Sequence, residues 1–251
     1  MKIKQKIFET IFWKKTISDG LCKFFRSFFK RKTHINQTTE KLDENEIIDF
    51  YYIGLTAYKR CGKDTAALII KDYFESRGIK AEIYAFADIL KDYVCSILNI
   101  SRDELDRMKN ENDTVVIKTG DSGEYKEYLM RDFLIYVGEN LKKVSNNNAI
   151  WAEFVLKRIQ QDKIHKKIKV AIISDVRYLS EHKLLQKEFK SYKRYFLFRI
   201  KSDLPRCKWN KNEVEVDKLE NREFFFEVYN SKENINSMKN QIYNILDKEI
   251  K

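Results

Sequence analysis

The sequence predicts an α/β fold in which a parallel sheet of about five strands is flanked by helices. Residues 51–65 pass from a short apolar run through a polar turn, which holds Gly62 and Lys63, into a helical pattern. Residues 168–174 form a continuous apolar run, which is typical of a parallel strand buried on both faces. Along the rest of the chain, further apolar runs alternate with helical patterns, as expected for parallel strands joined by helices.

The elements follow in order from these patterns. Gly78 comes directly after the first helix and is expected to end it in a left-handed conformation. Residues 101–123 are charged and loosely patterned, so we expect a mobile insertion there. The expected strands are 49–56, 81–87, 168–174, 194–200 and 224–229. The expected helices are 63–77, 88–99, 125–144, 150–162, 178–190 and 234–249.

Composition places the chain among globular proteins. It has 251 residues, of which 43% are hydrophobic and 14% aromatic, so it can bury a full core. The four cysteines and three histidines are scattered without paired spacing, which disfavours a disulfide framework or a zinc site and predicts a cytoplasmic setting. No apolar run approaches the roughly 18 residues that a membrane span needs.

The basic character of the chain is concentrated at its N-terminus. The formal net charge is +11, and residues 1–32 hold ten Lys or Arg against two acidic residues. Phe8, Ile11 and Phe12 fall at helical spacing, which predicts a basic amphipathic helix. Two alternatives stay open: the helix packs on the body of the chain, or it contacts an anionic membrane surface or a partner.

A polar linker is expected at residues 33–48, so the predicted organisation is an extension at 1–48 and a catalytic domain at 49–251. We expect a chain that starts near Asn45 to keep any catalytic activity. Because the domain is close to neutral, the sequence gives no support for sequence-specific binding of nucleic acid.

A strand that ends in a Gly-Lys turn and leads into a helix is the architecture of a phosphate-binding loop. Backbone N–H groups and the helix N-terminus point at an anion there, and Lys63 adds a positive charge. The common pattern is Gly, four residues, then Gly-Lys-Ser/Thr. Here Ala57 replaces the first Gly, Asp64 replaces the Ser/Thr, and Thr65 follows one place later.

Asp175 ends the apolar run 168–174, where phosphate-loop enzymes place an Asp that orients Mg2+ or its bound water. The alternative role for Asp175 is an ordinary helix cap at a strand–helix junction.

From about residue 51 to residue 250, the chain resembles the phage-type deoxynucleoside monophosphate kinases, in the nucleoside monophosphate kinase-like group of P-loop proteins. The loop from Ala57 to Thr65 resembles that family's variant, which also reads Gly-Lys-Asp-Thr. Four further matches are the segment 86–91 (with Ile89 in place of Pro), Arg131, Trp151, and Ser174-Asp175-Val176-Arg177 followed by Glu181. Tyr229-Asn230 resembles the closing strand, whereas residues 212–217 lack the family's His and Ser.

The resemblance implies a P-loop NTPase fold with a helical substrate-binding or lid insertion, and a kinase that transfers a phosphoryl group from ATP to a (deoxy)nucleoside monophosphate. It implies Mg2+ held by Thr65 and Asp175. Two roles stay open for Arg199 and Arg206: a lid cation over the phosphates, or a charge at the surface or the sheet edge. A homodimer is a further open expectation. The implied catalytic residues are Lys63, Asp175, Arg131 and Arg177. The implied ATP-binding residues are Lys59, Arg60, Cys61, Gly62, Lys63, Asp64 and Thr65. The implied acceptor-binding residues are Asp88, Lys91, Arg131, Trp151 and Arg177.

Two other functions remain open on the sequence. A phosphomevalonate kinase of animal type shares a Gly-Lys-Asp loop, an Arg-containing helix and a Ser-Asp-x-Arg block. A non-catalytic nucleotide-binding module, tethered through the basic N-terminus, would also account for Ala57 and for the missing His and Ser.

Overall fold

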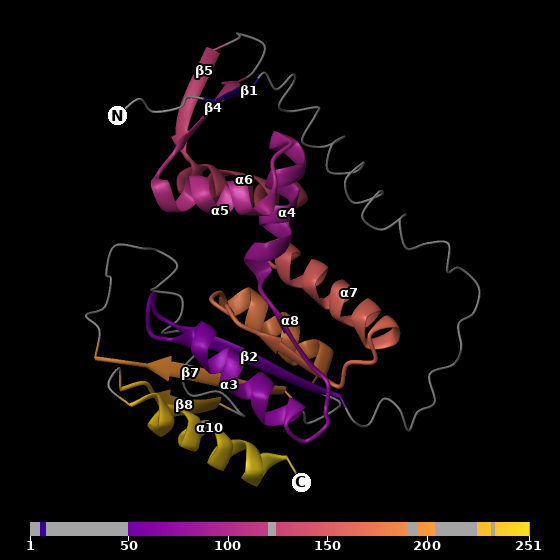
Figure 1. Cartoon of the computed structure of the whole chain (residues 1–251). Coiled ribbons are helices and arrows are strands. Elements are labelled where there is room, and N and C mark those ends of the chain that lie inside the picture. The colour runs from indigo at the N-terminus through magenta and orange to yellow at the C-terminus, as the bar shows by residue number, and fades with distance from the viewer. Residues whose placement is uncertain are drawn as a thin grey trace, which may run out of the picture. The chain divides into compact units, whose positions relative to one another are not determined.

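The computed structural model describes residues 6–8, 50–119, 124–189, 195–203, 225–231 and 234–250 (Figure 1). The chain divides into two compact units. The sheet unit holds residues 43–89 and 147–251, and the hairpin unit holds residues 90–146 together with the N-terminal residues up to 42.

The sheet unit is built on five parallel strands, in the spatial order β3-β6-β2-β7-β8. All five were expected from the sequence, and the parallel arrangement is confirmed. Their bounds are β2 Tyr51–Ala57, β3 Ala81–Tyr84, β6 Val170–Ile173, β7 Tyr195–Lys201 and β8 Phe225–Tyr229.

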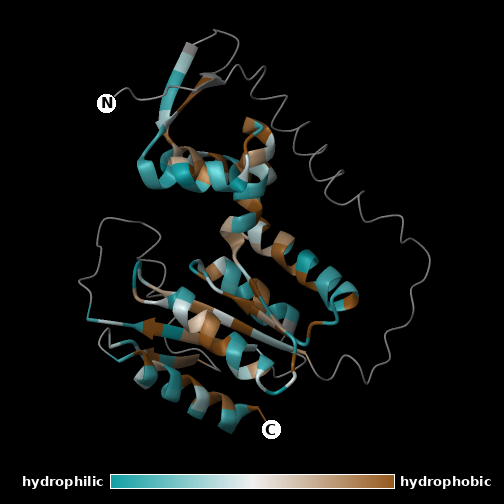
Figure 2. Cartoon of the chain, viewed as in Figure 1, coloured by the Kyte–Doolittle hydropathy of each residue, from teal (hydrophilic) through white to brown (hydrophobic). Residues whose placement is uncertain are grey.

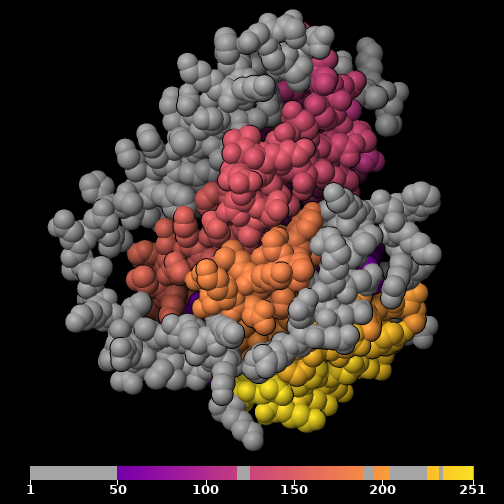
Figure 3. All heavy atoms as spheres, turned by 180° about the vertical axis from the view of Figure 1, so that it is seen from behind, coloured from indigo at the N-terminus to yellow at the C-terminus, as the bar shows by residue number. Residues whose placement is uncertain are grey.

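Helices cover both faces of this sheet, which explains why its strands read as continuous apolar runs. On one face, α3 (Lys63–Glu75) and α10 (Ile235–Glu249) pack on a core that includes Leu55 and Phe198. On the other face lie α7 (Ile150–His165) and α8 (Leu179–Phe189). In Figure 3, α8 is the orange region on the near side. There the ring of His182 lies 3.2 Å from the hydroxyl of Tyr195 in β7. In Figure 2, β7 is largely brown, as expected for a strand that is buried on both faces.

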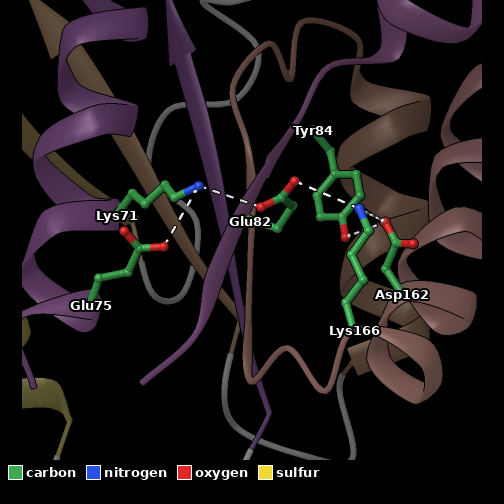
Figure 4. Close-up of polar contacts among 6 residues, drawn as sticks. All are labelled: Lys71, Glu75, Glu82, Tyr84, Asp162 and Lys166. Carbon is green, nitrogen blue, oxygen red and sulfur yellow. Dashed lines mark hydrogen bonds and ion pairs between the residues drawn. The ribbon is translucent and has the colours of Figure 1, made fainter. Parts of the chain in front are cut away.

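The edge strand β3 is tied to helices on both sides by charged side chains (Figure 4). Glu82 contacts Lys71 of α3 at 3.4 Å and Lys166, just after α7, at 3.7 Å. Tyr84 donates a hydrogen bond of 3.1 Å to the buried carboxylate of Asp162 in α7, and Lys166 contacts the same carboxylate at 3.1 Å. Burial and the negative charge of Asp162 raise the pKa of Tyr84, so this hydroxyl stays protonated. The network thus joins the edge strand β3 to a helix on each face of the sheet.

The hairpin unit has a three-stranded sheet in the order β1-β4-β5, in which β1 is parallel and β5 antiparallel to β4. Its apolar core includes Tyr93, Leu105, Ile117 and Phe133. Helix α4 begins in the sheet unit and continues into this one. The bounds are β1 Lys6–Phe8, β4 Thr114–Thr119, β5 Glu124–Leu129, α4 Phe86–Leu98, α5 Arg102–Glu111 and α6 Met130–Ser145.

Three expectations about this unit are wrong. Residues 101–119 are not a loose insertion, because Ser101 caps α5 by accepting the N–H of Glu104 at 3.1 Å and β4 follows directly. The helix expected from residue 125 starts only at Met130, because the preceding residues alternate between the two faces of β5.

The third error concerns the N-terminus. Residues 6–8 form a strand paired with β4, so part of the segment assigned to an accessory helix belongs to the sheet of the hairpin unit. The rest of the predicted extension and linker lies outside the described residues, as do residues 120–123 of the predicted insertion. Within the described ranges, no helix has the length and apolar character needed to cross a bilayer.

Candidate functional site

The loop between β2 and α3 has the form expected of an anion-binding turn. Ala57 is the buried last residue of β2, paired with Ile200 of β7, and its backbone is not in the left-handed region. A glycine is therefore not needed at this position, and the departure from the common pattern is accommodated by the strand. The positive backbone angles come later, at Arg60 (φ 67°) and Gly62 (φ 92°).

Gly62 is required at its position for two separate reasons. Its left-handed conformation strains any residue that carries a Cβ atom. A Cβ atom built there would also collide with the side-chain amide of Asn230, which lies directly against it. The glycine of the Gly-Lys pair is thus fixed both by local backbone geometry and by a residue far along the chain.

One contact within the loop and contacts from the ends of two strands hold the loop in place. Within the loop, the N–H of Cys61 donates to the carbonyl of Tyr58 at 3.2 Å. At the end of β7, the Ser202 hydroxyl lies 3.3 Å from the buried Sγ of Cys61. At the end of β8, Nδ2 of Asn230 donates to the carbonyl of Cys61 at 3.0 Å. The loop conformation is therefore organised before any ligand arrives.

Lys63 is the first residue of α3, and its side chain is 21% exposed. Its Nζ lies 2.6 Å from a carboxylate oxygen of Asp64, which is 79% exposed. The first N–H groups of a helix have no intrahelical acceptor, so they and this ammonium group form a positive pole at the loop. An anion at the loop would compete with Asp64 for the ammonium group.

With its parallel sheet and its strand–loop–helix, the chain has an α/β P-loop NTPase fold. No protein-family model matches the chain, and no curated protein matches it. Among solved structures it is similar to a gluconokinase from Sinorhizobium meliloti 1021, with 8% identity and a TM-score of 0.37 over 80% of this chain and 95% of that one.

Asp175 lies just past β6, the neighbour of β2 in the sheet, and its carboxylate accepts the N–H of Phe86 at 2.9 Å. It therefore caps α4, and not α8, which begins beside it. Burial raises the pKa of Asp175, while the N–H groups of Phe86 and Ala87 and the charges of Arg177 and Lys63 oppose that rise. The positive charge of Lys63 thus acts on the pKa of Asp175, so the predicted loop lysine and the predicted metal-orienting carboxylate interact electrostatically.

The N-terminus of α8 has its own carboxylate. One oxygen of the buried Glu181 accepts the backbone N–H groups of Arg177 and Tyr178, both at 3.0 Å. This fixes the turn that carries Arg177 beside Asp175. Glu181 thus provides the cap of α8, as Asp175 provides that of α4.

Thr65 and Asp175 are the residues that fit a magnesium ion here. Mg2+ bound to a nucleotide takes one or two protein oxygens and completes its shell with phosphates and water. The described residues contain no cluster of three or more His, Cys, Asp or Glu that would form an all-protein metal site. A hydroxyl in the first turn of α3 and a carboxylate at the adjacent strand end match the sparser nucleotide-dependent type.

The residues predicted to bind the acceptor divide between the two units. Asp88 (in the first turn of α4), Trp151 and Arg177 belong to the sheet unit, whereas Lys91 and Arg131 belong to the hairpin unit. The structure thus brings Arg177 together with Asp175 and Lys63, and leaves Lys91 and Arg131 on a separate body.

Several of these acceptor candidates already have structural partners or little exposure. Nζ of Lys91 donates to Asp106 at 2.9 Å, and Trp151 is 5% exposed and packs edge-on against Phe154. Arg131 is exposed on α6. Of the five acceptor candidates, Arg131 is the one that is exposed.

Sequence reasoning misjudged one arginine and missed two loop contacts. Arg199 was expected at a lid or on the surface, but it is buried in β7 and its Nη2 donates to the hydroxyl of Tyr58 at 3.2 Å. Arg206 lies outside the described residues. Ser202 and Asn230 follow the ends of β7 and β8, and the signal for them was their position at the carboxyl edge of parallel strands, where ligand sites form.

Proposed function

We propose that the chain is an ATP- and Mg2+-dependent kinase that phosphorylates a nucleoside or deoxynucleoside monophosphate to the diphosphate. The observation that carries the proposal is the pre-organised loop with Lys63 at its end and Asp175 at the end of the neighbouring strand. The resemblance of the loop and of Ser174-Asp175-Val176-Arg177 to phage-type deoxynucleoside monophosphate kinases supports the choice of acceptor.

Phosphoryl transfer depends on in-line positioning and on neutralising the oxygens of the transferred group. The loop N–H groups bind the phosphate chain of ATP, and Lys63 exchanges its contact with Asp64 for the β- and γ-phosphates. Thr65 and Asp175 would provide oxygens for Mg2+, which would supply neutralisation of the phosphate charge.

The acceptor phosphate needs a cation on the opposite side of the transferred group. Arg177 is fixed beside Asp175 by the turn that Glu181 caps, and its planar fork can bind two phosphate oxygens at once. Arg131 of the hairpin unit is the second candidate, because it is exposed and carries the same fork.

The proposal is tested by measuring ADP release with a panel of nucleoside and deoxynucleoside monophosphates, to which phosphomevalonate is added. We expect turnover with at least one nucleotide acceptor and none with phosphomevalonate. If the chain binds ATP but phosphorylates none of the nucleotides, nucleoside monophosphates are excluded as acceptors. Turnover with phosphomevalonate alone would identify a phosphomevalonate kinase instead.

A further inference from the structure

Asn230 lies directly against the peptide that joins Cys61 to Gly62, although 169 residues separate it from Cys61. Its Nδ2 donates to the Cys61 carbonyl at 3.0 Å, and its amide occupies the space that a Cβ atom on Gly62 would need. The contact therefore depends on the orientation of one peptide in the phosphate loop, the one between Cys61 and Gly62.

The backbone around Asn230 is itself firmly held. Its N–H donates to the carbonyl of Lys201 in β7 at 2.7 Å. Gln241 of α10 brackets the preceding residue, because its Oε1 accepts the N–H of Tyr229 and its Nε2 donates to the Tyr229 carbonyl, both at 3.0 Å. Asn230 thus projects from a fixed platform formed by two strands and a helix.

The direction of a carbonyl fixes the direction of the N–H group in the same peptide. The peptide is planar and trans, so the N–H of Gly62 points away from the side to which the Cys61 carbonyl points. Since the carbonyl is directed at Asn230, the N–H is directed to the other side of the loop. A flip of this peptide would exchange a positive N–H for a negative carbonyl oxygen at that side.

We propose that Asn230 is a positioning residue of the phosphate loop: by holding the Cys61 carbonyl, it keeps the Gly62 N–H facing the phosphate of the bound nucleotide. This rests on the proposed function, because it needs a phosphate at the loop. Asn230 acts through the loop backbone and does not itself contact the nucleotide.

The test uses inorganic tripolyphosphate and the full chain labelled with 15N-glycine, because only seven glycine signals are then present. In the wild type, we expect the Gly62 amide proton to shift downfield as tripolyphosphate binds. In Asn230→Ala, the shift should be lost and the Kd should rise by about tenfold to a hundredfold, as expected when a hydrogen bond to a charged group is lost.

Asn140→Ala is the matched control, because Asn140 also donates its Nδ2 to a backbone carbonyl, that of Tyr136 in α6, at 2.8 Å. This variant should bind tripolyphosphate like the wild type. If Asn230→Ala fails to fold, the near-isosteric Asn230→Leu keeps the packing against Gly62 without the donor, and the same losses are expected.

The outcomes separate the two proposals. The positioning role is overturned if the wild type and the Asn230 variants bind tripolyphosphate equally well and the variants keep the Gly62 shift. The kinase proposal would then still stand. A wild type that does not bind tripolyphosphate would overturn both.

Discussion

The phosphate-loop edge of the sheet unit and the hairpin unit contribute candidate site residues of very different character. At the loop edge, Cys61 and Gly62 are held by side chains from the ends of β7 and β8. In the hairpin unit, Lys91 is paired with Asp106, and Arg131 stands exposed on a helix.

The difference follows from what each part must do. A loop that binds the common triphosphate group works best when its N–H groups are fixed in advance, so that little ordering is needed on binding. A surface that selects an acceptor depends on a few exposed side chains that bind only when the acceptor is present. We therefore expect larger losses of activity from changes at the loop edge than from changes in the hairpin unit.

The largest effect is expected at Lys63. Lys63→Met should lower kcat by about 10²–10³-fold, because one preorganised charge at the transferred phosphate is removed. The ammonium contacts only the exposed Asp64 within the described residues, so the melting temperature should change little. Steady-state ADP release measures the loss, and Lys71→Met on the same helix, whose partners are Glu75 and Glu82, should keep wild-type turnover. Wild-type turnover in Lys63→Met would remove the loop from the mechanism.

Gly62→Ala comes next and has a matched control in Gly78→Ala. Both glycines have positive φ, but an added Cβ collides with Asn230 at Gly62 and meets nothing within 4 Å at Gly78. Both variants should lose stability by about 1–3 kcal/mol from backbone strain, but only Gly62→Ala should also lose ATP binding. Chemical denaturation and titration calorimetry measure the two quantities. Equal ATP affinity in the two variants would show that the loop tolerates the collision.

Asp175→Asn should change activity and stability in opposite directions. Turnover should fall by about 10–100-fold through the weakened metal site. The pKa of Asp175 is raised by burial, so its ionised form destabilises the ligand-free protein. This cost is absent below the ordinary Asp pKa of about 3.9 and develops as the pH rises through the folded-state value.

The variant should therefore gain melting temperature relative to the wild type between pH 4 and pH 7. Its amide oxygen can still accept the N–H of Phe86. A melting-temperature difference that stays constant across this pH range would contradict the assigned environment of Asp175.

In the hairpin unit, Arg131→Ala should raise the KM of the monophosphate by about tenfold, as expected from one lost charge-assisted contact, and leave the KM of ATP unchanged. Arg107→Ala is the matched control, because Arg107 is also exposed but is paired with Glu111 and Asp113. If both variants show the same acceptor KM, Arg131 has no role in acceptor binding.

The smallest effect is expected at β3, the edge strand of the sheet unit. Tyr84→Phe removes the hydrogen bond to Asp162, which keeps Lys166 as a partner, and should cost about 1 kcal/mol of unfolding free energy. Kinetic constants should not change. Urea denaturation measures the cost, with Tyr125→Phe on the exposed side of β5 as a neutral control. A loss equal to that of the control would mean that the network in Figure 4 adds nothing to stability.

The same division explains what could be predicted from the sequence. The five strands of the sheet unit were found because burial on both faces makes them continuous apolar runs, and the Gly-Lys turn was found because its geometry is local. The short strand β5 was taken for helix because charged residues lie on both of its faces, so its sequence shows no alternation of polar and apolar residues. The contact of Asn230 with Cys61 joins residues from opposite ends of the domain, and no local pattern encodes it.

The most direct measurement of the central claim is the melting temperature of the full chain with a non-hydrolysable ATP analogue and Mg2+, alone and with each monophosphate in turn. A ligand that binds only the folded protein stabilises it in proportion to the logarithm of its concentration over Kd. We predict a rise with the analogue, a further rise with one or a few nucleoside monophosphates, and neither rise in Lys63→Met. A chain whose melting temperature is unmoved by the analogue would contradict the account.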